Sequence, residues 1–349
     1  MVRITRGLAI MLLPLSNPPC RPAPVQGNLQ ERSDTLLKDK ITIGIPRAFL
    51  FFKYQYLWQT FFAELNCQVI LSPETNKKIL KEGIDSSIDE SCLSAKIYMG
   101  HLAYLRGKAD FILVPRIVGF GRKEEVCTKF NALYDIVKNT FKEVNLLSYN
   151  IDMAHQESEF KGFMKMGREL GKNPALVLKA YLKGKRLQKK MELQLAEEQE
   201  SLIQGKDKLK ILIIAHDYNT YDKVVGYPVV KHLESLGIVP VYADAADKKK
   251  TALKSRLISD TLYWTFNKEL IGAIDHYQQN IDGIIFISTF PCGPDSLVNE
   301  LCLRKIKGVP MANIIVDELQ GEAGLQTRIE SFVDIIMERK KTGREAQIG

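Results

Sequence analysis

Short apolar runs alternate with longer amphipathic stretches along this chain. Five runs are continuous and rich in β-branched residues, and they lie at 41–45, 111–114, 211–215, 284–287 and 314–316. Runs that are apolar on both faces are typical of central strands in a parallel sheet covered by helices. The amphipathic stretches between them, which predict helices, lie at 51–65, 93–105, 224–236 and 262–277. Strand and helix in alternation predict an α/β fold with doubly wound, mostly parallel sheets.

The alternation occurs twice, which predicts two lobes. We expect two flavodoxin-like or Rossmann-like lobes, the first over 41–150 and the second over 209–349. A helical segment at 151–208 would join them. The first part, 1–40, carries an apolar run at 8–15 but lacks the small-residue cleavage site of a signal peptide. We expect it to be a disordered extension or the product of a start codon assigned too far upstream.

Composition and charge narrow the class of protein. With 45% hydrophobic and 26% charged residues, the 349-residue chain is typical of a globular protein large enough for two domains. The net charge of +8 is concentrated in 161–210, which holds 13 Lys and Arg against 6 Asp and Glu. A solvated helical face explains this surplus, and a surface for an acidic partner or phosphate-bearing ligand is the alternative.

Several classes of partner and location are not expected. Aromatic residues do not interleave the basic ones as base-stacking would require, so nucleic acid is not an expected partner. No segment after the first 40 residues approaches the ~20 apolar residues that span a bilayer, so we expect no membrane association. The six cysteines show no short-spaced disulfide framework, which favours reduced thiols and a cytoplasmic location.

Three of the six cysteines lie in polar loops that follow predicted buried segments. These are Cys92, Cys127 and Cys292, whereas Cys67 and Cys302 lie among apolar residues and are expected to pack in the core. Thiolates gathered from distant loops suit an iron–sulfur cluster or zinc, and three ligands leave one metal position open. No CxxC pair fixes such a geometry, so the spacing alone favours three unrelated thiols over a metal site.

The polar motifs fall at the carboxyl ends of predicted strands, where open parallel sheets bind ligands. If the two sheets face each other by these edges, they enclose a cleft. His216, which directly follows the run at 211–215, has either a structural or a site role. The chain has no GxxxxGK[ST] motif and no GxGxxG after a strand, so no loop for nucleotide phosphates is visible.

Several motifs occur in a fixed order along the chain: Ile43-Gly44-Ile45-Pro46-Arg47-Ala48, Asp89-Glu90-Ser91-Cys92, Pro115-Arg116, Cys127-Thr128-Lys129, Cys292-Gly293-Pro294-Asp295-Ser296 and Gly321-Glu322-Ala323-Gly324. Over about 41–340 they resemble the acyl-CoA dehydratase activase-related proteins, often described only as a domain of unknown function. That family is similar to the 2-hydroxyacyl-CoA dehydratase subunits and to the double-cubane cluster proteins of anaerobes. Ser94 and Thr128 depart from the pattern, since proline is expected at both positions.

The resemblance implies a cofactor and its ligands. It implies that Cys92, Cys127 and Cys292 bind a [4Fe-4S] cluster between two flavodoxin-like lobes, or each half of a double-cubane cluster at a dimer interface. Supporting charges are also implied. Lys96 and Lys129 would offset the cluster's charge. Glu318, Glu322 and Arg328 would shape the loop that faces the cluster.

The resemblance further implies a partner and a reaction. A separate ATP-hydrolysing activase would reduce the cluster, and low-potential electrons would pass to a small substrate, such as a 2-hydroxyacyl-CoA that undergoes dehydration. The alternatives are a non-catalytic electron carrier or cluster-bearing partner of the activase, and a metal-free α/β binding protein. Whether the chain is an enzyme, whether it forms a homo- or heterodimer, and which residues would be catalytic are left open, and no residue identifies a CoA site.

Overall fold

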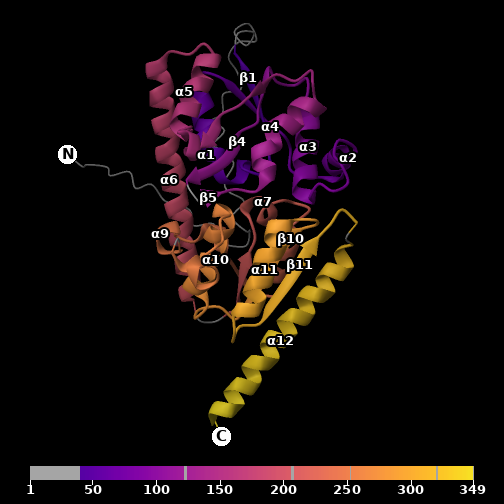
Figure 1. The fold of residues 1–349 in the computed structure, drawn as a ribbon. Helices are drawn as coiled ribbons and strands as arrows, with labels where there is room; N and C mark the ends of the chain where they lie inside the picture. Colours follow the sequence, from indigo (N-terminus) through magenta and orange to yellow (C-terminus); the bar gives the residue numbers. More distant parts are fainter. Residues whose placement is uncertain (1–39, 122–123, 206–207, 252, 320, 349) are drawn as a thin grey trace, which may run out of the picture.

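The computed structural model of the chain describes residues 40–121, 124–205, 208–251, 253–319 and 321–348 (Figure 1). The predicted leader at 1–40 therefore lies, except for its last residue, outside the described residues. Two parallel sheets, stacked one above the other in Figure 1, form the framework of the molecule.

The two sheets have the same strand order. The first runs β2 (Gln68–Leu71), β1 (Thr42–Ile45), β3 (Phe111–Leu113), β6 (Leu146–Leu147). The second runs β11 (Met311–Val316), β10 (Gly283–Thr289), β8 (Lys210–Ile214), β9 (Val239–Tyr242). All strand pairings in these two sheets are parallel. When the strands of each sheet are numbered by their order along the chain, they lie side by side in the order 2-1-3-4. This is the flavodoxin-like order, so the predicted doubly wound α/β lobes are confirmed.

Helices cover the faces of both sheets. Those of the first half are α1 (Phe51–Glu64), α2 (Lys77–Asp85), α3 (Leu93–Leu105), α4 (Thr128–Thr140), α5 (Glu159–Glu169) and α6 (Pro174–Gln204). Those of the second half are α7 (Asp217–Thr220), α8 (Tyr227–Ser235), α9 (Lys248–Thr251), α10 (Thr265–Tyr277), α11 (Gly293–Lys305) and α12 (Glu322–Ile348). Short 3-10 turns occur at η2 (Met153–His155), η3 (Ala243–Ala245) and η4 (Lys254–Leu257). None of the helices in the described part of the chain combines the length and low polarity needed to cross a bilayer.

A small third sheet lies beside the first lobe. It runs β5 (Glu124–Glu125), β4 (Arg116–Gly121), β7 (Asn150–Asp152), with one antiparallel and one parallel pairing. The backbone of Glu125 also forms an isolated bridge with Trp264 of the second lobe. This sheet therefore carries the loop before α4 to the boundary between the lobes.

Helix α6 runs along both lobes (Figure 1) and holds them together. In the first lobe the amide of Gln188 donates to the carbonyl of Lys53 at 2.6 Å. In the second, the side chain of Gln199 donates to the carbonyl of Tyr242 and accepts from its N–H, both at 2.7 Å. Buried residues from both sheets, including Ile43 and Ile285, belong to one continuous core. The lobes are thus packed against each other as one body.

Candidate functional site

Cys92, Cys127 and Cys292 line one small cavity between the two lobes. Each occupies the N-cap position of a 13-residue helix: α3, α4 and α11 respectively. None of the three side chains makes a capping hydrogen bond to its own helix. Three helix N-termini, whose free N–H groups carry partial positive charge, therefore meet where the three thiols meet.

Burial raises the pKa of all three thiols. After burial, the carboxylate of Asp295 raises the pKa of Cys292 further. The thiols also act on one another, because Cys127 raises the pKa of Cys92, and Cys92 raises that of Cys292. Without a bound cation these groups are therefore neutral thiols at physiological pH, which does not suit a nucleophile. A coordinated metal would supply the positive charge that keeps them as thiolates.

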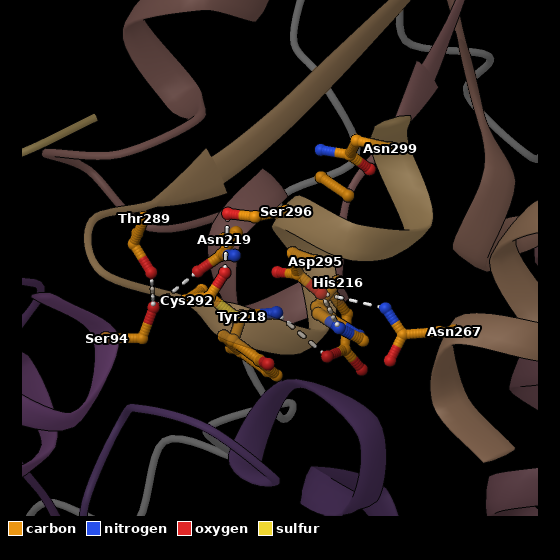
Figure 2. Close-up of polar contacts among 12 residues, drawn as sticks. Ser94, His216, Tyr218, Asn219, Asn267, Thr289, Cys292, Asp295, Ser296 and Asn299 are labelled. Carbon is orange, nitrogen blue, oxygen red and sulfur yellow. Dashed lines mark hydrogen bonds and ion pairs between the residues drawn. The ribbon is translucent and has the colours of Figure 1, made fainter. Parts of the chain in front are cut away.

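A buried polar network supports the Cys292 loop from the second lobe (Figure 2). The Oδ1 atom of Asp295 lies 2.9 Å from Nε2 of His216 and accepts a hydrogen bond from Asn267 at 2.8 Å. Burial alone would lower the pKa of His216, but the Asp295 carboxylate outweighs it and the pKa is raised. Against the effect of burial, His216 in turn lowers the pKa of Asp295. The two groups consequently stabilise each other in their charged forms.

Tyr218 and its neighbours form the apolar part of the wall. Its ring stacks on His216 with centroids 4.9 Å apart and an interplanar angle of 11°. Burial raises the pKa of Tyr218, and Asp295 and the three cysteines, which line the same cavity, raise it further. Phe49, Phe130, Trp264 and Phe266 also line the cavity. An aromatic shell of this kind restricts access of water to the thiols.

Ser94, one of the two departures from the expected proline, connects the lobes at this site. Its hydroxyl donates to Oδ1 of Asn219 at 2.7 Å and lies 2.8 Å from the hydroxyl of Thr289 (Figure 2). Beside it, the backbone N–H of Leu93 donates to the carbonyl of Phe290 at 2.9 Å. Proline has no hydroxyl, so serine at this position provides a link that the expected residue would not.

The predicted supporting charges occupy different places. Lys129 lines the cavity, with Nζ 3.5 Å from the hydroxyl of Ser91. Lys96 is buried and pairs with Glu318 at 2.9 Å, joining α3 to the loop before α12. Arg328 donates to the carbonyl of Asn313 at 2.8 Å. The side chain of the remaining predicted residue, Glu322, lies outside the described part of the structure.

The cavity has limited space and a sulfur-rich donor set. Its free volume is about 20 Å³, which is room for about one water molecule. In the described residues, no group of three His, Cys, Asp or Glu side chains is close enough to hold a single metal ion. A [4Fe-4S] cluster attaches its thiolates to separate iron atoms, so its ligands stand farther apart than those of one ion. The three cysteines are free and line the cavity, so they suit a cluster by type.

Sequence reasoning missed several residues of this site. Asp295 lies in the first turn of α11, which begins at Gly293, and its carboxylate contacts His216. Asn267 gave no signal, because its partner Asp295 is 28 positions away along the chain. The sequence did point to His216 as a candidate, because this residue directly follows a strong predicted strand. Cys67 and Cys302 are buried in the core, as expected.

Comparison with known proteins gives one informative match. A family model described as the CoA enzyme activase uncharacterised domain (DUF2229) matches residues 42–246, more than half of the chain. The matched region includes Cys92 and Cys127 but ends before Cys292. No curated protein matches the chain.

Two solved structures show only distant likeness. The crystal structure of ZnuA is 11% identical, with 85% of this chain and 98% of that chain covered and a TM-score of 0.28. Glucosamine-6-phosphate deaminase from Thermotoga maritima is 9% identical, with coverage of 87% and 86% and a TM-score of 0.21. At such TM-scores neither likeness informs fold or function.

Proposed function

This chain belongs to the family of the CoA enzyme activase uncharacterised domain, and from this premise we propose that it is an iron–sulfur protein. In this proposal a separate ATP-dependent activase reduces the cluster. The reduced protein then passes low-potential electrons to a small substrate. The observation that carries the proposal is the meeting of Cys92, Cys127 and Cys292 in one cavity, each at the start of its own helix.

The residues around the cavity suit the support of an anionic cluster. Cys92, Cys127 and Cys292 would ligate a [4Fe-4S] cluster, or half of a double-cubane cluster at a dimer interface. When bound, the cluster supplies one-electron chemistry. The three helix N-termini and Lys129 would offset thiolate charge, and the aromatic wall would exclude water. His216 and Asn267 hold Asp295 in place beside Cys292.

The lack of a nucleotide-binding motif in the sequence is the reason for proposing an activase partner. The sequence shows no phosphate-binding loop of the GxxxxGK[ST] type, so ATP-driven reduction would require another protein. The substrate that the family resemblance favours is a 2-hydroxyacyl-CoA, which would undergo reductive dehydration. Under this hypothesis the chain is a dehydratase-like lyase, acting in the cytoplasm as a homo- or heterodimer.

A second candidate function is that of an electron carrier or cluster-bearing partner of the activase without catalysis of its own. The small free volume at the cysteines favours it, because a substrate has no room beside them in this conformation. A third candidate, a metal-free α/β binding protein, is favoured by a larger cavity that adjoins the site.

Anaerobic reconstitution followed by iron and sulfide analysis tests the cluster. We expect about four irons per chain in the wild type and a loss of cluster in Cys92→Ala, Cys127→Ala and Cys292→Ala. The matched control is Cys67→Ala, which removes a buried thiol outside the cavity and should retain iron. Less than about one iron per chain in the wild type would overturn the iron–sulfur proposal.

Assays with an activase separate enzyme from carrier. The reconstituted protein is mixed with an activase and ATP, and cluster reduction is followed by absorbance with and without a 2-hydroxyacyl-CoA. Formation of the dehydrated product in excess over the electrons supplied supports the enzyme, because dehydration is redox-neutral overall and the electron would return to the cluster after each turnover. Reduction without any product supports the carrier, and no reduction at all contradicts both.

A further inference from the structure

A second, larger cavity lies beside the cysteine site. Its volume is about 490 Å³, within the ~300–1,000 Å³ of small-molecule sites. Residues of α1, α6 and α10 and of the 243–251 segment enclose it. Its apolar lining comes mainly from leucine and alanine side chains, among them Leu50, Leu182, Leu193, Leu195, Ala196 and Leu270. A wall of this composition accommodates an aliphatic body better than a sugar or a nucleobase.

The outer rim of this cavity is cationic. Arg186 and Lys189 of α6 line it and are exposed, and neither has an ion-pair partner among the described residues. Lys185, which also lines the rim, pairs with Glu159 at 2.8 Å. Glu192, the carboxylate of α6 that also lines the cavity, lies 3.9 Å from Lys248, so the two unpaired cations form a favourable position for an anionic group.

The charges deeper in the cavity are already paired. Lys53 contacts Glu269 at 2.6 Å and lies 4.3 Å from the centroid of the Phe266 ring. On the far wall, Asp244 and Asp247 have polar partners within the protein. An anionic group of a ligand is therefore attracted to Arg186 and Lys189 at the rim rather than to the interior of the cavity.

The inner end of the cavity adjoins the cysteines. His216, Tyr218 and Phe266 line both this cavity and the one that holds the three thiols. His216 and Phe266 are buried, whereas Leu182 and Leu193 on α6 are exposed. The cavity therefore extends from solvent at α6 to a layer one side chain thick beside Cys92, Cys127 and Cys292.

We propose that this cavity binds an amphiphilic anion, with its aliphatic body against the leucines and its carboxylate or phosphate head at Arg186 and Lys189. The functional meaning rests on the proposed function, because the inner end of the ligand would lie next to the source of electrons. The binding itself requires no cluster, so it is measurable on the full chain purified without metal.

Calorimetric titration with three eight-carbon probes tests the ligand class. We expect octyl phosphate and octanoate to bind saturably at one site per chain, and uncharged 1-octanol to bind about tenfold more weakly, for want of the charged contact. The ratio between octyl phosphate and octanoate then distinguishes a phosphate from a carboxylate head. Equal affinity for 1-octanol, or no saturable binding of any probe, would overturn the proposal.

Two double variants on one helix test the location. Arg186→Glu with Lys189→Glu reverses both rim charges and should weaken octyl phosphate about tenfold. Lys179→Glu with Lys190→Glu makes the same change in net charge on exposed residues of α6 outside the cavity lining, and should alter binding less than twofold. Equal weakening by both would show general surface attraction and contradict the site.

Further variants test the apolar body and separate this proposal from the iron–sulfur one. Leu193→Trp narrows the mouth of the cavity at an exposed position and should weaken the binding of all three probes, whereas unchanged binding would count against this cavity.

Cys127→Ala should lose iron yet bind octyl phosphate normally. A wild type that binds octyl phosphate but no iron would refute the cluster and leave the cavity standing. A wild type that binds iron but none of the three probes would refute the cavity proposal and leave the cluster proposal standing.

Discussion

The two lobes share a strand order but position their cysteines by different means. In the first lobe, α2 and α3 cross with their backbones in contact: a Cβ atom added at Gly100 would lie 2.0 Å from the carbonyl oxygen of Ile79. This crossing sets the position of α3, and therefore of Cys92 at its start. In the second lobe, the start of α11 at Cys292 is held by the buried contacts among His216, Asn267 and Asp295.

The difference predicts two kinds of sensitivity. Backbone contact tolerates no added volume but does not depend on charge, because no titratable group takes part. A buried network tolerates changes of shape better, but it fails when one charged or hydrogen-bonding partner is removed. Variants in the two lobes can therefore separate steric from electrostatic positioning of the cysteines.

Gly100→Ala should have the largest effect. The added methyl group has only backbone to displace at the α2–α3 crossing, so we expect a loss of about 3 kcal/mol or more in the free energy of unfolding. Urea denaturation measures it. Gly293→Ala in the first turn of α11 is the matched control, because no atom lies within 4 Å of its added Cβ. Comparable losses in both variants would show that the crossing is not tightly packed.

Asp295→Ala should have the next largest effect. Removal of the carboxylate leaves His216 and Asn267 buried without their common acceptor, at a cost of about 2 kcal/mol. Denaturation of the metal-free protein measures the loss, and Asp295→Asn, which keeps an acceptor oxygen but no charge, should recover part of it. If Asp295→Ala is as stable as the wild type, the network does not position the Cys292 loop.

A second polar connection between the lobes depends on pH. The backbone N–H of Arg47 donates to Ser72, whose hydroxyl contacts Nδ1 of His101 at 2.8 Å. Nε2 of His101 lies 3.0 Å from the hydroxyl of Thr75, which donates to Asp222 of the second lobe. Burial lowers the pKa of His101 to about 3 and raises that of Asp222 to about 6. His101 is therefore neutral at pH 7, and Asp222 is ionised at a cost.

Asp222→Asn should change how stability varies with pH. Because the pKa of Asp222 is raised from 3.8 to about 6, the folded protein binds this proton more tightly than the unfolded chain does. The wild type therefore loses stability, relative to the variant, as pH rises from about 4 to 6, by about 3 kcal/mol in all, of which about 2 kcal/mol falls between pH 4.5 and 7.5. Above that range the difference should be constant. Urea denaturation at pH 4.5 and 7.5 checks this, and a difference that does not grow with pH would contradict the shifted pKa.

The sequence predicted the framework better than the site. Continuous β-branched runs at 211–215 and 284–287 identified β8 and β10, because central parallel strands are buried on both faces. The short strands β2 and β9 were missed, because four residues beside a helix end give little periodic signal.

Within the site, what depends on local sequence was predictable, and what depends on packing was not. Polar loops after buried segments identified Cys92, Cys127 and Cys292 as a group. Asn267 and Asp295 are 28 positions apart, and only the packing of α10 against α11 brings them into contact. The larger cavity was equally invisible, because it depends on how α6 lies across both lobes.

Ser94→Ala should have the smallest effect and tests the link between α3, which begins directly after Cys92, and the second lobe. It removes the hydrogen bond to Asn219 and the contact with Thr289, so we expect a loss of about 1 kcal/mol in unfolding free energy. Thr140→Ala is the matched control, because its hydroxyl bonds only within the exposed end of α4. Equal stability of the two variants would mean that Ser94 adds nothing to the coupling, leaving the N–H of Leu93 and the carbonyl of Phe290 as the hydrogen bond that connects α3 to the Cys292 loop.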